Sequence, residues 1–95
     1  MEITVRFAGP LRVLAGCQEM TLPLADGATL RDLLHTLHKV LTAPFIEQVL
    51  DPLEASAGPL PLILINRMHP RDRAALERPL ADGDVVAFVP PMAGG

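Results

Sequence analysis

The sequence predicts an α+β domain in which one main helix packs on one face of a small sheet. Three features support this prediction: apolar and polar residues alternate near the N-terminus, an amphipathic helical stretch follows, and two apolar, β-branched runs lie in the second half. The chain has 95 residues, 49% hydrophobic and 20% charged, which is typical of a globular domain with one core. We therefore expect residues 1–95 to form a single domain.

The first two predicted strands lie near the N-terminus. Residues 2–8 (EITVRFA) alternate between apolar and polar side chains, which indicates a half-buried strand. Residues 9–16 (GPLRVLAG) begin with Gly-Pro and end with Gly, so they have room for only a turn or a short helical piece. Residues 17–24 (CQEMTLPL) predict a second strand that turns Cys17 and Glu19 to one face.

The main helix is predicted to begin after Thr29. Thr29 is a good N-cap residue, and Asp32 follows three positions later, as in a capping box. At about 100° per residue, six apolar side chains fall within an arc of about 120°. They are Leu30, Leu33, Leu34, Leu37, Val40 and Leu41. Pro44 is expected to end or restart the helix, and residues 51–61, with three prolines, predict a loop.

Two apolar runs, residues 62–66 (LILIN) and 84–89 (DVVAFV), predict interior strands. The order strand, strand, helix, strand, strand is that of the β-grasp fold, with a mixed sheet. The last strand is apolar on both faces. Val86 and Phe88 would pack under the helix, and the opposite face would carry Val85, Ala87 and Val89. That face is expected either to be covered by residues 70–76 or the proline-rich loop, or to be buried by another protein.

Composition argues against several classes of function. Eight basic and eleven acidic residues give a net charge of −3, and no basic run is present, so we expect no nucleic-acid partner. No apolar run approaches the roughly 18 residues of a membrane span, and no signal peptide is evident. A single cysteine, Cys17, fits a reducing compartment, so a cytoplasmic location and a structural role for Cys17 are expected.

The polar residues do not assemble a familiar catalytic motif. There is no phosphate-binding glycine loop, nucleophile elbow or carboxylate pair, so we expect no active site within this chain itself. His35 and His38 are spaced for one face of a helix, but no third ligand is evident, and no metal site is expected. His69, near Arg67, Arg71 and Arg73, is interpreted as part of a solvated loop, with a site for an anion or an acidic partner as the alternative.

The last six residues, 90–95, predict a protruding tail. Pro90 and Pro91 fix φ and remove two backbone donors, so they end sheet pairing and favour an extended chain. Gly94 and Gly95 lack Cβ atoms and would fit a channel too narrow for side chains. The residues expected to thread into a partner are Pro90, Pro91, Met92, Ala93 and Gly94. The carboxylate of Gly95, ionised at pH 7, would be the reactive group.

Two segments carry a resemblance to a known family. PLADGDVVAFVPPMAGG resembles the C-terminal segment of the ubiquitin-like sulfur carriers of the MoaD/ThiS family, and VRFAGPLRVLAG resembles their first strand and turn. The branch that looks most similar is the molybdopterin synthase small subunit, MoaD. Residues from about 43 to 61 are not covered. The resemblance implies that a ubiquitin-activating-like adenylyltransferase (MoeB-like) uses ATP to adenylate Gly95, and that a sulfur donor then forms a thiocarboxylate.

The resemblance also implies a partner and an acceptor. The tail would enter the large subunit of molybdopterin synthase (MoaE-like), in a heterotetramer, and give its sulfur to a pyranopterin precursor of the molybdenum cofactor. The carrier would bind no cofactor of its own. The surface facing the partner would include Val85, Ala87, Val89 and Ala8, the last at a position where many relatives have an aromatic residue.

Three other functions remain open at this point. The chain would also suit a sulfur carrier for another pathway, such as thiamine, cysteine or tungsten cofactor synthesis. A ubiquitin-like modifier would instead join Gly95 to lysines of other proteins. A plain interaction domain would make no use of the terminal glycines.

Overall fold

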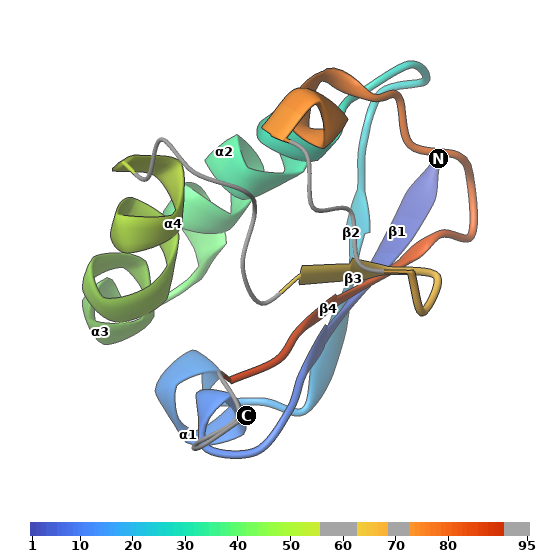
Figure 1. Cartoon of the computed structure of the whole chain (residues 1–95). Helices are drawn as coiled ribbons and strands as arrows, with labels where there is room; N and C mark the ends of the chain where they lie inside the picture. Colours follow the sequence, from blue (N-terminus) through green and yellow to red (C-terminus); the bar gives the residue numbers. More distant parts are fainter. Residues whose placement is uncertain (56–62, 69–72, 91–95) are drawn as a thin grey trace.

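The computed structural model describes residues 1–55, 63–68 and 73–90, and in this part of the chain four strands form one mixed sheet (Figure 1). The strands are β1 (Glu2–Phe7), β2 (Glu19–Pro23), β3 (Ile63–Ile65) and β4 (Val85–Phe88), in the order β2-β1-β4-β3. β1 pairs antiparallel with β2 and parallel with β4, and β4 pairs antiparallel with β3. The predicted β-grasp arrangement is confirmed.

Helices α2, α3 and α4 lie on one side of the sheet, and α1 lies near the end of β1 (Figure 1). The helices are α1 (Leu11–Ala15), α2 (Leu30–Val40), α3 (Ala43–Phe45) and α4 (Asp51–Ala55), with a π-helical turn at Ile46–Leu50 and a 3-10 turn at Arg73–Glu77. α1 is the short helical piece expected between the first two strands. Gly16 ends it in the left-handed conformation, at φ 81°, which glycine adopts without steric cost.

The main helix starts as the sequence predicts. The Thr29 amide donates to Asp32 Oδ2 at 2.9 Å, and the Asp32 amide donates to Thr29 Oγ1 at 3.3 Å, which completes a capping box. The Asp32 carboxylate accepts hydrogen bonds from the Thr29 amide and, at 3.1 Å, from Thr29 Oγ1, and these two bonds lower the pKa of the carboxyl because they favour its ionised form. The predicted stripe is buried except at Val40, which is 50% exposed. Val40 is the last residue of α2, and Leu41 directly after it is buried.

The core lies between the sheet and the helices. Phe7 and Phe88 are paired across β1 and β4, and their rings stack with centroids 5.9 Å apart. Phe45 of α3 meets both rings edge-on, at 5.2 and 5.6 Å from the rings of Phe7 and Phe88. The same sheet face buries Ile3, Val5, Ile63 and Val86 completely. Phe88 therefore packs under the helices, as strand parity predicts, and Phe45 joins the helical segment to the sheet.

The predicted loop over residues 51–61 is wrong in its first part. Residues 51–55 form α4, which continues from the π-helical turn, and Leu53 is only 3% exposed. Proline has a φ suited to the start of a helix, so Pro52 does not prevent it, and burial of Leu53 favours the helical conformation. The remaining residues, 56–62, lie outside the described part of the chain.

The two late strands differ in position. β4 is interior, as predicted, but β3 lies at an edge of the described sheet, so its prediction as an interior strand is wrong. An apolar run does not reveal this, because edge and interior strands can share it. The 3-10 turn at 73–77 packs beside α2, where Arg31 donates to Glu77 at 2.6 Å, and its Ala75 and Leu76 join the core. The described part of segment 70–76 thus covers the helical side, not the opposite face.

Candidate functional site: the root of the tail and the open sheet face

The strand from which the tail starts is held on both sides. On the β1 side, the Thr4 amide donates to the Asp84 carbonyl and the Ala8 amide to the Phe88 carbonyl, both at 3.0 Å. On the β3 side, the side chain of Asn66 accepts from the Val85 amide at 2.9 Å, and the Asn66 amide donates to the Val85 carbonyl at 2.8 Å. β4 is therefore a rigid base for the residues that follow it.

The chain leaves the sheet beside the turn that follows β1. The hydrogen bond from Ala8 to Phe88 is followed by Val89 and Pro90, both half-buried, and Pro90 has no amide hydrogen to continue the ladder. Gly9 has φ 54°, and a Cβ atom there would lie 3.5 Å from Pro90 Cγ. The root of the tail is thus in close contact with the β1–α1 turn. Residues 91–95, the rest of the predicted threading segment with Gly95, lie outside the described residues.

In the described part of the chain, the sheet face opposite the helices is open over β1 and β4. Two neighbouring hollows lie there and share Arg6 and Ala87. Ala8 lines the first hollow and Val85 the second, and Val85, Ala87 and Ala8 are all half-buried. Three of the four residues predicted to face a partner are therefore brought together on one surface. Val89 does not line either hollow, although it comes only two residues after Ala87 in the sequence.

Two arginines at these hollows, Arg6 and Arg12, were missed by the sequence analysis, which considered Arg67 only together with His69. Arg6 and Arg12 line the first hollow, and Arg6 and Arg67 the second. Arg6 Nε is 3.0 Å from Glu19 Oε2 in an exposed ion pair. Arg67 has φ 71° and follows Asn66 at φ 49°, in a tight turn closed by two hydrogen bonds between Ile65 and Met68. The alternation of residues along β1 predicts that Arg6 faces away from the core. Only the parallel pairing of β1 with β4 places it beside Ala87.

This surface has the chemistry of a docking site for another protein. Small apolar side chains form its floor, and guanidinium groups, which bind carboxylates in a bidentate way, lie around it. It is continuous with the strand that carries the tail. A partner that covers it would also be placed to receive the residues after Pro90.

The other candidate residues have separate positions. Cys17 is a free thiol, half-buried against the core, in keeping with a structural role. His35 is exposed, whereas His38 is half-buried beside Glu54 of α4 and close to Asp51. The sequence did not reveal this group, because residues 51–61 were predicted as a loop. Arg67 is exposed, but His69 and Arg71 lie outside the described residues.

The described part of the chain contains no helix with the length and apolar character needed to cross a membrane.

A family model described as the ThiS family matches residues 5–95. The chain belongs to the ThiS family. The match begins within β1 and includes β4 and the whole tail, and it also runs through residues 43–61, which the resemblance noted above did not cover. Its fold is accordingly that of the ubiquitin-like proteins of the MoaD/ThiS type.

Individual relatives of this ThiS-family chain are similar along their whole length. The molybdopterin synthase sulfur carrier subunit of Chlamydomonas reinhardtii is 32% identical over 97 residues, covering 100% of both chains. A complex of subunits 1 and 2 of molybdopterin-converting factor from Helicobacter pylori 26695 contains a chain 27% identical, with TM-score 0.63 and full coverage of both chains. The small archaeal modifier protein SAMP1 from Haloferax volcanii is 26% identical, with TM-score 0.73 and full coverage.

Proposed function

We propose that this chain is the sulfur carrier and small subunit of a molybdopterin synthase. The observation that carries the proposal is the anchoring of β4, which is hydrogen-bonded on both sides and ends two residues before Pro90, where the tail begins. Such a base would fix the point from which the last residues enter a partner. The homologous sulfur carrier subunit from Chlamydomonas reinhardtii supports the same role.

The chemistry would take place at the carboxylate of Gly95. An ATP-dependent adenylyltransferase of the MoeB-like kind would form the acyl-adenylate and release pyrophosphate. Sulfide, or an equivalent sulfur donor, would then attack the acyl carbon and displace AMP, which leaves a thiocarboxylate and a proton. A carboxylate needs this activation because its oxygen is a poor leaving group. The thiocarboxylate would deliver sulfur to a pyranopterin precursor.

The partner in that last step would be a MoaE-like large subunit, in a heterotetramer. The open face with Val85, Ala87 and Ala8 would contact it, and residues 90–94 would thread toward its active site. The Helicobacter pylori relative, which forms a complex of subunits 1 and 2 of molybdopterin-converting factor, supports a large-subunit partner. The carrier itself would supply no catalytic side chain.

The decisive test is the intact mass of the full chain after incubation with ATP, an adenylyltransferase of the MoeB-like kind and sulfide. Exchange of one oxygen for sulfur should add about 16 Da, the signature of an activated acyl group captured by sulfide. Deletion of Gly95, or one serine added after it, should abolish the gain, whereas one serine added before Met1 should not. No gain with an activating enzyme that is active on its own carrier would refute the proposal.

A second function, protein modification, is favoured by the similarity to SAMP1 of Haloferax volcanii. In that case Gly95 would become joined to lysine side chains through isopeptide bonds. Mass spectrometry of proteins from the native cells would then find lysines that carry the C-terminal residues of this chain. A carrier for another pathway would gain the same mass but fail to convert a pyranopterin precursor with the large subunit.

A further inference from the structure

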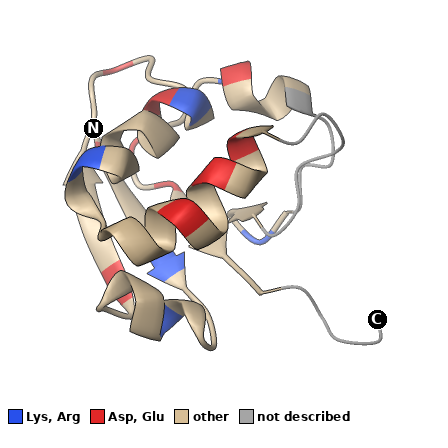
Figure 2. Cartoon of the chain, turned by 90° about the vertical axis from the view of Figure 1, so that its left-hand side faces the viewer, with Lys and Arg blue, Asp and Glu red and all other residues tan. Residues whose placement is uncertain are grey.

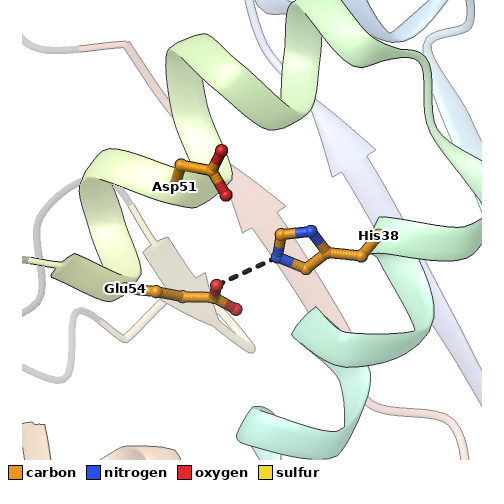
Figure 3. A group of neighbouring side chains, drawn as sticks. All are labelled: His38, Asp51 and Glu54. Carbon is orange, nitrogen blue, oxygen red and sulfur yellow. Dashed lines mark hydrogen bonds and ion pairs between the residues drawn. The ribbon is translucent and has the colours of Figure 1, made fainter.

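A cluster on the helical side of the molecule brings one histidine together with two carboxylates. His38 comes from α2, and Asp51 and Glu54 come from α4 (Figure 3). One ligand atom from each residue lies within 4.8 Å of the other two, and His38 Nε2 is 2.9 Å from Glu54 Oε2. We propose that these three side chains bind one divalent transition-metal ion of the Zn²⁺ type.

The fold places these ligands reproducibly. Asp51 and Glu54 are three residues apart, so they project from the same face of α4. Leu50 and Leu53, both buried, fix this helix against the core, and Leu37, next to His38, is buried beneath α2. The three ligands therefore stand on two elements that are already packed, and only their side chains need to move.

The spacing is close to that of a bound ion. Zn²⁺ bonds to imidazole nitrogen at about 2.0–2.1 Å and to carboxylate oxygen at about 2.0–2.2 Å, so ligand atoms around one ion lie at most about 4 Å apart. The separation of up to 4.8 Å requires a shift of about an ångström. The side chains of His38 and Glu54 are 28% and 36% exposed, which leaves room for that shift and for a water ligand.

Charge and ligand type favour a transition metal. The helical segment 43–55 contains Glu47, Asp51 and Glu54 and no Lys or Arg (Figure 2). A dication would reduce the repulsion between neighbouring carboxylates. Mg²⁺ and Ca²⁺ prefer oxygen ligands alone, whereas an imidazole with carboxylates suits Zn²⁺ and its neighbours in the first transition row.

The ion would connect α4 to α2 and so fasten the segment that carries Phe45 into the core. None of its ligands lies on β4 or on the open face, and the proposal does not depend on sulfur transfer.

The test is calorimetric titration of the metal-free full chain with ZnCl₂, on a Cys17→Ser background that removes the thiol as a competing ligand. We expect saturable binding of one ion per chain and a rise in the melting temperature. His38→Ala, Asp51→Asn and Glu54→Gln should each weaken Zn²⁺ binding by at least about ten-fold, a loss that even outer-shell changes can produce. His35→Ala, on α2, and Glu47→Gln, in the π-helical turn before α4, are matched controls and should bind as the parent does.

Several results would overturn the proposal. Absence of saturable binding in a chain with native circular dichroism would mean that the hydrogen bond between His38 and Glu54 forms without a metal ion. Binding that survives in all three ligand variants, or is lost equally in the controls, would place the ion elsewhere. Equal affinity for MgCl₂ would contradict the assignment to a transition metal.

Discussion

Replacing Phe88 with alanine should strongly destabilise the fold, because one side chain supports both the sheet and the helical segment. Its ring is fully buried, and its centroid lies 5.9 Å from that of Phe7 and 5.6 Å from that of Phe45. Removing a buried Phe side chain costs about 3–5 kcal/mol, and each aromatic pair contributes about 0.5–1.5 kcal/mol of that. A domain of this size has about 5–14 kcal/mol of stability, so Phe88→Ala should remove a large fraction of it.

The free energy of unfolding should be measured by urea titration followed by far-ultraviolet circular dichroism, since the chain has no Trp or Tyr to report by fluorescence. Ala87→Ser, at the next residue on the opposite face, is the matched control and should change stability by less than about 0.5 kcal/mol. The urea concentration at the midpoint of unfolding should be lower for Phe88→Ala than for the parent, while the dependence of the unfolding free energy on urea concentration stays the same. A loss below about 1 kcal/mol would mean that the aromatic cluster does not hold the two layers together as the structure indicates.

Three further predictions test the helix cap, the open face and the turn beside the tail. Asp32→Asn should flatten the dependence of the melting temperature on pH below about 4. Hydrogen bonds from Thr29 lower the pKa of the Asp32 carboxyl in the folded protein. The carboxylate therefore stabilises the fold above the pKa that Asp32 has in the unfolded chain, and this stabilisation is lost as pH falls through the lower pKa of the folded protein. Ala87→Glu should weaken binding to the large subunit in a pull-down or titration, because the new carboxylate fills the hollow and pairs with the arginines that would otherwise bind the partner. The free energy of unfolding should change by no more than about 0.5 kcal/mol. Gly9→Ala should cost about 1–2 kcal/mol in urea unfolding, because φ is 54°, and Gly9→Asn should cost less.

Each of these has a result that contradicts it. Parallel loss of stability in acid by Asp32→Asn and the parent would show that the cap carboxylate does not contribute to the pH dependence. Unchanged affinity of Ala87→Glu for the large subunit would remove the open face from the interface. An equal cost for alanine and asparagine at Gly9 would point to contact with Pro90, and not to the backbone conformation, as the source of the strain.

Local patterns predicted much of the fold because they report interactions between near neighbours. The capping box of Thr29 and Asp32 is a three-residue motif, and the alternation in β1 and β4 follows directly from strand geometry. The helix at 51–55 was missed because Pro52 favours a turn locally, whereas burial of Leu53 depends on the rest of the fold. The edge position of β3 was missed for a related reason, since strand order is a long-range property.

The sequence by itself determined the secondary structure from β1 to the end of α2 and the face of β4 that enters the core, whereas a tail that begins at two prolines and ends in two glycines stays a prediction. Those features depend on local backbone preferences and on the spacing of apolar residues, and both are visible in the sequence. Only the tertiary structure decided that β1 lies parallel beside β4, and so that Arg6 stands next to Ala87 on an open face. It also decided that α4 brings two carboxylates to His38. Contacts of this kind join residues far apart in the chain, and their cause is the packing of whole elements.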